Sequence, residues 1–261
     1  MKVVFLGTSG YGATLTRNTV SILLDDHILI DAGEGVTRRL LKRGCTGNIT
    51  HVFLSHGHMD HLIGLFPLLW QFIVVEKRRS PLKITCPLYV EHAIKQILQL
   101  TSFPLAIKNF SLDFQGLDMD KESEFQVTIP GYKITGMALE HYPPCIGYRF
   151  NKFEDNSRVK SLAFTGDTGP TDKIAELAFQ VDLLITECSF PSSYAQEAHR
   201  LHHLTPVDAG IAASAAGCAR LGLIHHPDYL LEHKTDVIKE ISKHYPENQI
   251  VFCEDKLEIL I

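Results

Sequence analysis

The sequence predicts an α/β fold in which two β-sheets pack face to face and carry helices on their outer faces. Two observations lead to this prediction. Short β-type runs occur together with helical segments in both halves of the chain, so that each half can build a sheet with its own helices. The chain has 261 residues, 45% of them hydrophobic, enough to bury a substantial core near the upper size of one compact domain. We therefore expect a single domain over residues 1–261.

The first part of the chain is expected to form strands that lead into a histidine-rich loop. The runs VVFLG, SILL and HILIDAG are β-type and are broken by Gly or Asp, and residues 7–12, GTSGYG, are typical of a turn-rich loop. The segment GVTRRLLKRG predicts a helix that stops at Gly44, and HVFLS predicts a strand that enters the sequence SHGHMDH. Leu62 begins the next helix, expected to be buried, because the apolar segment up to Val75 is too short to span a bilayer.

The second part repeats strand and helix in alternation. After the strands EFQVTI, YKITGMAL and IGYRF, further strands are expected at SLAFTGD, VDLLITE, RLGLIHH and QIVFC. Helices are expected between them at TDKIAELAF, at PVDAGIAASAAG and, as one continuous helix, over Asp228–His244.

Charge and cysteine content limit the partners and the compartment. The net charge is −5 and the isoelectric point is near 6.3, so the overall field does not attract nucleic acid, and any such binding has to be local. The six cysteines lie far apart without a C-x-x-C pair, which favours free thiols in a reducing compartment, by default the cytoplasm. The apolar run at the N-terminus is too short for a signal peptide.

The sequence SHGHMDH concentrates His56, His58, Asp60 and His61 within six residues. On a helix these positions would point about 0°, 200°, 40° and 140° around the axis, so they cannot share one face. In an extended loop that leaves a strand, the first three tend to one side and His61 turns away as the next helix begins. The alternative is a solvated polar loop without a ligand.

Imidazole and carboxylate groups suit zinc and similar divalent ions, and a catalytic site takes about three protein ligands and keeps one open position. Two ions would need more ligands than one loop holds. Three further candidates follow β-type runs: His141, Asp167 and His225. Ordinary alternatives are a loop histidine for His141 and a turn or helix-capping aspartate for Asp167.

Over nearly its whole length the sequence resembles the metallo-β-lactamase superfamily, and within it the ribonuclease Z-like phosphodiesterase branch. The resemblance rests on motifs in the family's order: FLGTSG with Arg17-Asn18, LIDAGEG, SHGHMDH, AFTGDT, LLITECSF, HHLT and LGLIHH. It implies an αββα sandwich with a dinuclear site at one edge, in a protein whose relatives often form homodimers.

The resemblance also implies a set of ligands. One ion would be held by His56, His58 and His141, the other by Asp60, His61 and His225, with Asp167 as the bridge. His226 stays open as the alternative to His225, because the two are neighbours in sequence; the pair His226-Pro227 departs from the family's usual residues. The family's His-x-Thr pattern falls on His203, supported by Glu187, and leaves His199 and His202 as surface residues.

Two divalent ions, zinc or alternatively manganese, can lower the pKa of a shared water and hold an ester oxygen during in-line attack. His203, oriented by Glu187, is expected to protonate the leaving oxygen. A strand-end salt bridge is the alternative for Glu187. The pair favours phosphodiesters over β-lactams and thioesters.

The substrate class depends on the interval between His141 and Asp167. Ribonuclease Z enzymes carry a long tRNA-gripping arm there, and residues 142–166 leave no room for one. The sequence therefore favours a small or cyclic phosphodiester. An RNA or tRNA 3′-processing nuclease without the arm is the alternative, and a catalytically idle metal-binding interaction module is a third possibility.

Overall fold

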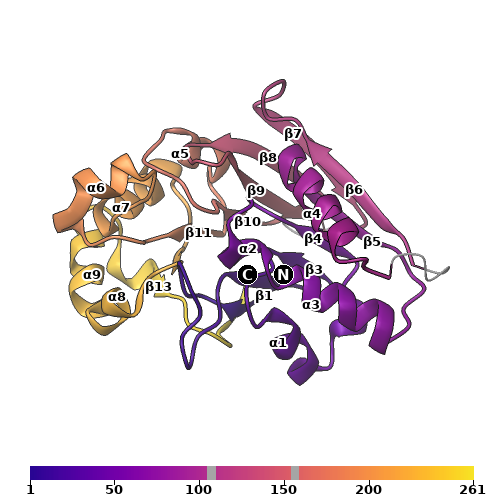
Figure 1. The fold of residues 1–261 in the computed structure, drawn as a ribbon. Helices are drawn as coiled ribbons and strands as arrows, with labels where there is room; N and C mark the ends of the chain where they lie inside the picture. The colour runs from indigo at the N-terminus through magenta and orange to yellow at the C-terminus, as the bar shows by residue number, and fades with distance from the viewer. Residues whose placement is uncertain (105–109, 154–158) are drawn as a thin grey trace.

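The computed structural model describes residues 1–104, 110–153 and 159–261. Within these ranges the chain forms two mixed sheets of seven strands each, packed against one another and flanked by helices (Figure 1). The predicted fold class, two sheets face to face with helices outside, is confirmed.

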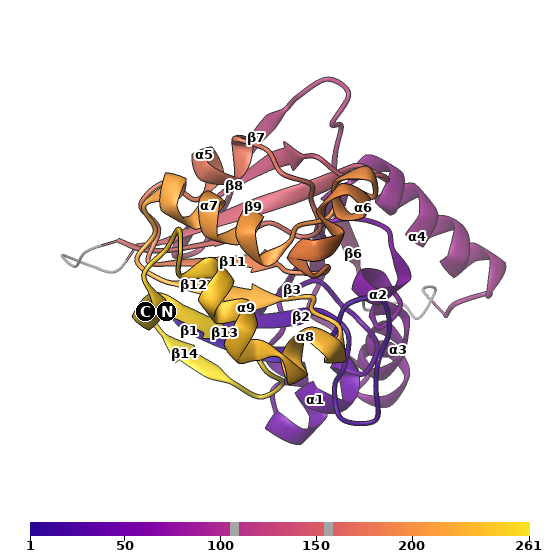
Figure 2. The same cartoon turned by 90° about the vertical axis from the view of Figure 1, so that its left-hand side faces the viewer.

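The first sheet is built from the N-terminal half and the last strand. Its order is β14-β1-β2-β3-β4-β5-β6, in which β1, β2 and β3 run antiparallel and β3 to β6 run parallel. The chain ends lie side by side, because β1 pairs with β14 (Figures 1 and 2). The strands are β1 Lys2–Gly7, β2 Ser21–Leu24, β3 Ile28–Ile30, β4 His51–Phe53, β5 Leu82–Pro87, β6 Leu112–Leu117 and β14 Glu258–Leu260.

The second sheet has the order β13-β12-β11-β10-β9-β8-β7, with β7 to β10 antiparallel and β10 to β13 parallel. Its strands β8, β10, β11 and β12 therefore all run in one direction, and the loops that follow them lie at the same edge of the sheet. The strands are β7 Glu124–Ile129, β8 Tyr132–Leu139, β9 Cys145–Lys152, β10 Lys160–Phe164, β11 Leu183–Glu187, β12 Leu221–Ile224 and β13 Ile250–Phe252.

Helices cover the outer face of each sheet. Buried residues of α1, α3 and α4 share an apolar cluster with the first sheet, and those of α5, α7 and α9 share one with the second (Figure 1). The helices are α1 Val36–Arg43, α2 Met59–Leu62, α3 Leu65–Trp70, α4 Leu88–Leu100, α5 Lys173–Leu177, α6 Ala195–Arg200, α7 Pro206–Ala216, α8 Asp228–Glu232 and α9 Lys234–Ile241. None of the helices in the described ranges is long and apolar enough to cross a bilayer.

A third apolar cluster fills the space between the sheets. Phe53 of β4 packs edge to face against Tyr148 and Phe150 of β9, with ring centroids 5.4 and 5.2 Å apart. All three are fully buried, and burying one phenylalanine side chain contributes about 1.5–3 kcal/mol. The Tyr148 hydroxyl also donates to the carbonyl of Leu54, 2.9 Å away. These contacts fix β4, and with it the histidine-rich loop that follows, against the second sheet.

Two helix predictions need correction. The continuous helix expected over Asp228–His244 is two helices, α8 and α9, separated at His233, whose φ and ψ are −104° and 23°. The apolar pattern does not reveal this break. The buried Leu230 and Val237 are seven residues apart, and in one continuous helix this spacing would also put both side chains on the same face. Leu62, expected to begin a helix, instead ends the short helix α2, and the next helix, α3, begins at Leu65 after a two-residue turn and continues into a π-helical turn over Gln71–Val75.

Candidate metal centre

The seven ligand-type residues singled out in the sequence all meet at one edge of the sandwich. His56 and His58 lie in the loop after β4, and Asp60 and His61 lie in α2. The other three follow strands of the second sheet: His141 after β8, Asp167 after β10 and His225 after β12. They form two groups in which the ligand atoms lie within 4.8 Å of one another: His56, His58, His141 and Asp167; and Asp60, His61 and His225.

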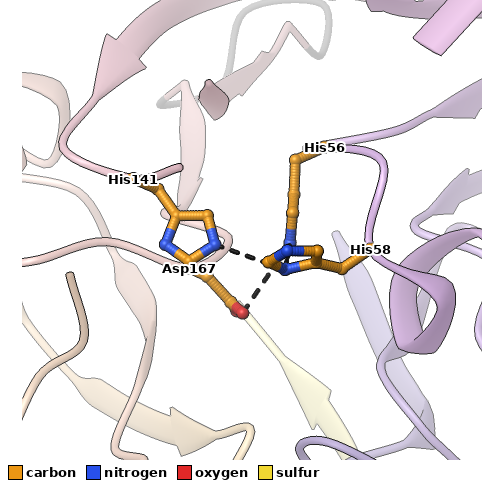
Figure 3. A group of neighbouring side chains, drawn as sticks. All are labelled: His56, His58, His141 and Asp167. Carbon is orange, nitrogen blue, oxygen red and sulfur yellow. Dashed lines mark hydrogen bonds and ion pairs between the residues drawn. The ribbon is translucent and has the colours of Figure 1, made fainter. Parts of the chain in front are cut away.

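The first group brings three imidazole nitrogens together. Nε2 of His56 lies 3.0 Å from Nδ1 of His58, and Nε2 of His141 lies 3.4 Å from the same atom. Figure 3 shows the three rings converging with the carboxylate of Asp167, whose Oδ2 is 3.8 Å from His56 Nε2.

The second group meets the first at Asp167. Nε2 of His225 lies 3.2 Å from Oδ2 of Asp167 and 3.2 Å from Oδ2 of Asp60. Nε2 of His61 lies 3.3 Å from Oδ1 of Asp167. The Asp167 carboxylate therefore contacts both groups, the position that a bridging ligand occupies. The backbone just before Asp167 passes close to Ser55, which requires glycine at position 166. Gly166 has φ of +63°, and a Cβ added to it would lie 2.8 Å from the Ser55 Cβ.

On the side of the first sheet, Asp31 and Ser55 hold the outer ring nitrogens of two histidines. Nδ1 of His61 donates to Oδ2 of Asp31 over 2.7 Å. The Ser55 hydroxyl donates to the same carboxylate at 2.8 Å, so its oxygen accepts from Nδ1 of His56 at 3.0 Å. Both rings thus donate through Nδ1 and turn Nε2 into the cluster, where the neutral form of the ring offers a lone pair.

On the side of the second sheet, His141 and His225 are oriented in the same way. Nδ1 of His141 donates to the carbonyl of His202 at 3.1 Å, and Nδ1 of His225 donates to Oγ of Ser189 at 2.7 Å. Ligating histidines nearly always donate their second nitrogen in this manner.

The cluster interior thus consists almost entirely of acceptors. Nε2 of His61 and Oδ1 of Asp167 are buried and have no hydrogen-bond partner among the described residues. Buried polar atoms without partners are rare and costly. Divalent cations would satisfy both atoms together with the other lone pairs, so the residues present fit a pair of metal ions.

The pKa shifts agree with this electrostatic arrangement. Burial lowers the pKa of His56, His58 and His141, so these rings stay neutral and keep a lone pair. Burial also disfavours charge on His61, but the carboxylates of Asp167 and Asp31 outweigh it and hold its pKa well above the usual value. The carboxylates that attract a proton to His61 would attract a metal cation in the same place.

A second pair of residues lies beside the cluster. Nδ1 of His203 donates to the Glu187 carboxylate, 2.9 and 3.0 Å from its two oxygens. Glu187 is fully buried and also accepts from the backbone N–H of Thr168 and of Leu204. Burial lowers the pKa of His203, but the charge of Glu187 outweighs it and raises this pKa to about 9. Nε2 of His203 is left to face Asp167 and His225, with which His203 forms a third group of ligand-type residues.

The structure separates the neighbours His225 and His226. His225 faces the cluster, whereas His226 is buried away from it between Arg17 and Cys253. Nη2 of Arg17 donates to Nδ1 of His226 at 3.0 Å, so Nε2 carries the proton and donates to the carbonyl of Cys253 at 3.0 Å. Arg17 also bonds the carbonyl of Thr8, and it thereby ties the loop after β1 to the loop after β12.

Asp31 and Ser189, which accept hydrogen bonds from His61 and His225, were not among the site residues predicted from the sequence. Asp31 directly follows a β-type run, as Asp167 does, so a search for acidic residues after such runs would have found it. Ser189 follows Glu187 by two residues and bonds both Glu187 and His225, and no sequence signal marked it. His199 and His202 are exposed, as expected, although the backbone carbonyl of His202 orients His141.

The two-sheet sandwich and the paired His/Asp cluster define a metal-dependent hydrolase. A sequence model described as the Beta-lactamase superfamily domain matches residues 26–226, and the chain belongs to this superfamily. It is 27% identical to ribonuclease Z of Haloarcula marismortui over 99% of this chain and 96% of that protein.

Solved structures agree with the fold. The metallo-beta-lactamase fold protein YhfI of Bacillus subtilis superposes with a TM-score of 0.80 at 23% identity, covering 99% of this chain and 98% of that one. The short form of human tRNase Z superposes with a TM-score of 0.78 at 24% identity, covering 100% and 99%.

Proposed function

We propose that this chain is a dinuclear metal-dependent phosphodiesterase of the ribonuclease Z type, with RNA as its substrate. The observation that carries the proposal is the hydrogen bond between His203 and Glu187 beside the two metal-ligand groups. A buried, oriented imidazole next to a cation site is the arrangement needed to protonate an alkoxide leaving group, which phosphodiester hydrolysis requires.

The proposed ligands follow the two groups. His56, His58 and His141 would hold one ion and Asp60, His61 and His225 the other, and Asp167, whose carboxylate reaches both groups, would be available to both. Nitrogen and oxygen donors in this ratio suit zinc, with manganese as the alternative. When bound, the two ions supply an activated water and neutralise charge on the phosphate.

The protein residues perform the remaining steps. Glu187 holds the Nδ1 proton of His203, so the proton that can be given to the leaving oxygen is on Nε2. The negative charge of Glu187 stabilises the imidazolium before that transfer. Asp31 and Ser189 keep the lone pairs of His61 and His225 directed inward.

The comparisons reverse the order of substrates expected from the sequence. Relatives that match nearly the whole chain include proteins named ribonuclease Z, which supports RNA ahead of small or cyclic diesters as the substrate. The Haloarcula relative aligns over 302 residues, more than the 261 of this chain, so it carries residues that this chain lacks. The short interval 142–166 keeps a small or cyclic phosphodiester as the second candidate.

A substrate panel tests the proposal. The metal-loaded protein should cleave 3′-extended tRNA with a higher kcat/KM than an arbitrary short RNA, cyclic nucleotides or dinucleotides, and this activity should fall as salt rises. Faster turnover of the small diesters, insensitive to salt, would favour the second candidate. Absence of any diester hydrolysis, bis(p-nitrophenyl) phosphate included, would favour an idle metal-binding module.

Two further features of the protein belong to this proposal. The six cysteines are buried and free, which supports a reducing compartment such as the cytoplasm. The chain is proposed to act as one domain over residues 1–261.

A further inference from the structure

The loop after β1 contains a strained turn centred on Tyr11. The N–H of Gly12 donates to the carbonyl of Gly10 at 2.8 Å, and Tyr11 between them has φ of +64°. A three-residue turn of this hand is rare and strained, and glycine adopts a positive φ at far lower cost than tyrosine. Strain of this kind persists where the surroundings impose it, and it is concentrated at functional sites.

The surroundings that impose it are residues of the metal centre. The backbone N–H of Tyr11 donates to Oδ2 of Asp60 at 2.9 Å. Gly10 presses against His225 so closely that an added Cβ would lie 2.6 Å from its carbonyl oxygen and 2.7 Å from Nδ1. The loop is therefore held by Asp60 and His225, and Tyr11 has a defined position above them.

The ring of Tyr11 lies over the part of the centre that contains His203. Its centroid is 5.2 Å from that of His225, 5.8 Å from that of His203 and 6.3 Å from that of Phe190. Phe190 in turn lies 5.7 Å from His203. Tyr11 nevertheless keeps 53% of its surface exposed. Tyr11 and Phe190 meet edge to face, with ring planes 79° apart, so a base can stack on only one of them, and the more exposed Tyr11 offers that face. We call this pair beside His203 the aromatic shelf.

The shelf is uncharged. A phenylalanine ring carries no ionisable group, and the usual pKa of a tyrosine hydroxyl, about 10, leaves it neutral at physiological pH. Any nucleobase can stack on a neutral aromatic face, and this stacking contributes roughly 1–3 kcal/mol per base. Because the net charge of −5 provides no general attraction for a polyanion, stacking is an apt local source of affinity.

We propose that the Tyr11–Phe190 shelf stacks the base of a nucleotide whose phosphate lies at the metal centre, on the side from which His203 acts. This inference rests on the proposed phosphodiesterase function and adds to it a determinant of specificity. The shelf selects diesters of nucleosides over diesters of small alkyl alcohols.

The test is direct binding of two ligands to the zinc-loaded protein, measured by calorimetry: adenosine monophosphate and inorganic phosphate. Tyr11→Ala keeps the backbone N–H that bonds Asp60 but removes the ring. We expect this variant to weaken the binding of adenosine monophosphate by roughly 5- to 150-fold, the range that one stacked base supplies, and to leave phosphate binding unchanged. Tyr11→Gly, which also relieves the positive φ, should show the same loss.

Tyr229→Ala is the matched control, because Tyr229 is 55% exposed and packs on His233, outside the metal centre. It should change neither affinity. The inference is overturned if wild type binds the two ligands equally well, or if Tyr11→Ala weakens both equally. Failure of the proposed function looks different, since nucleotide binding would then depend on Tyr11 while no diester is hydrolysed.

Discussion

Nδ1 of His203 lies 2.9 and 3.0 Å from the two carboxylate oxygens of Glu187, in a buried pair that adjoins Asp167. This geometry commits Nδ1 of His203 to Glu187 and leaves Nε2 as the atom that the proposed acid would use. The bond to Glu187 distinguishes His203, the proposed acid, from the residues proposed to hold metal. The two roles should give different results on mutation.

Substitution of His203 should therefore depend on the leaving group. His203→Ala should slow hydrolysis of nucleoside or alkyl diesters by roughly 10²–10⁴-fold, the contribution of general acid catalysis. It should slow bis(p-nitrophenyl) phosphate far less, since p-nitrophenolate leaves without a proton. Steady-state rates with both esters, and the metal content of the variant, provide the measurement. An equal loss on both esters, or loss of a metal ion, would make His203 a ligand or a structural residue.

Removal of the Ser189 hydroxyl should weaken metal binding without touching a proposed ligand. Ser189→Ala leaves the buried Nδ1–H of His225 without its acceptor, and loss of such partners typically costs 10- to 100-fold in metal affinity. Ser189→Thr keeps a hydroxyl and should retain most of the affinity. Ser192→Ala, which removes a hydroxyl bonded to Glu240 instead, is the control. Dissociation constants from chelator competition measure the effect, and equal affinities in all four proteins would contradict this role.

The stability of the metal-free protein should depend on His226. Burial and the neighbouring Arg17 lower the pKa of His226 to about 3 from a usual value of 6.5. Between about pH 3 and pH 6.5, His226 therefore binds a proton in the unfolded chain but not in the folded chain. The stability contribution is complete above about pH 6.5 and is lost as the pH falls toward 3.

His226→Asn removes this group, so between pH 6 and 4.5 its free energy of unfolding should fall less steeply than that of wild type. The difference should approach one proton, about 1.4 kcal/mol per pH unit. Denaturant titrations with chelator present supply the curves. Parallel curves for the two proteins would show that His226 is protonated as easily in the folded state as in the unfolded state.

Much of the centre could be predicted because its residues follow strands. His141, Asp167 and His225 are far apart in sequence, but the strands before them run in the same direction, so the chain delivers all three to one edge. The same rule makes the loop SHGHMDH recognisable, since it directly follows the strand β4.

The remaining features depend on contacts across long stretches of sequence. The ring of His226 is turned away from the cluster and bonded to Arg17, 209 residues earlier in the chain, and no local pattern encodes this contact. Ser189 matters only because β11 and β12 are neighbours in the sheet, which places it beside His225. The strained turn at Tyr11 likewise depends on Asp60, 49 residues away.

We propose that phosphodiester hydrolysis by this protein depends on two metal ions, with the Asp167 carboxylate shared between their ligand groups. The most direct measurement is titration of zinc into metal-free protein while bis(p-nitrophenyl) phosphate hydrolysis and bound metal are followed together. A dinuclear site predicts that activity rises to its maximum at two equivalents per chain, and that Asp167→Ala binds at most one ion and is inactive, since the Asp167 carboxylate contacts both groups. Full activity at one equivalent, with no second ion bound at zinc excess, would contradict it.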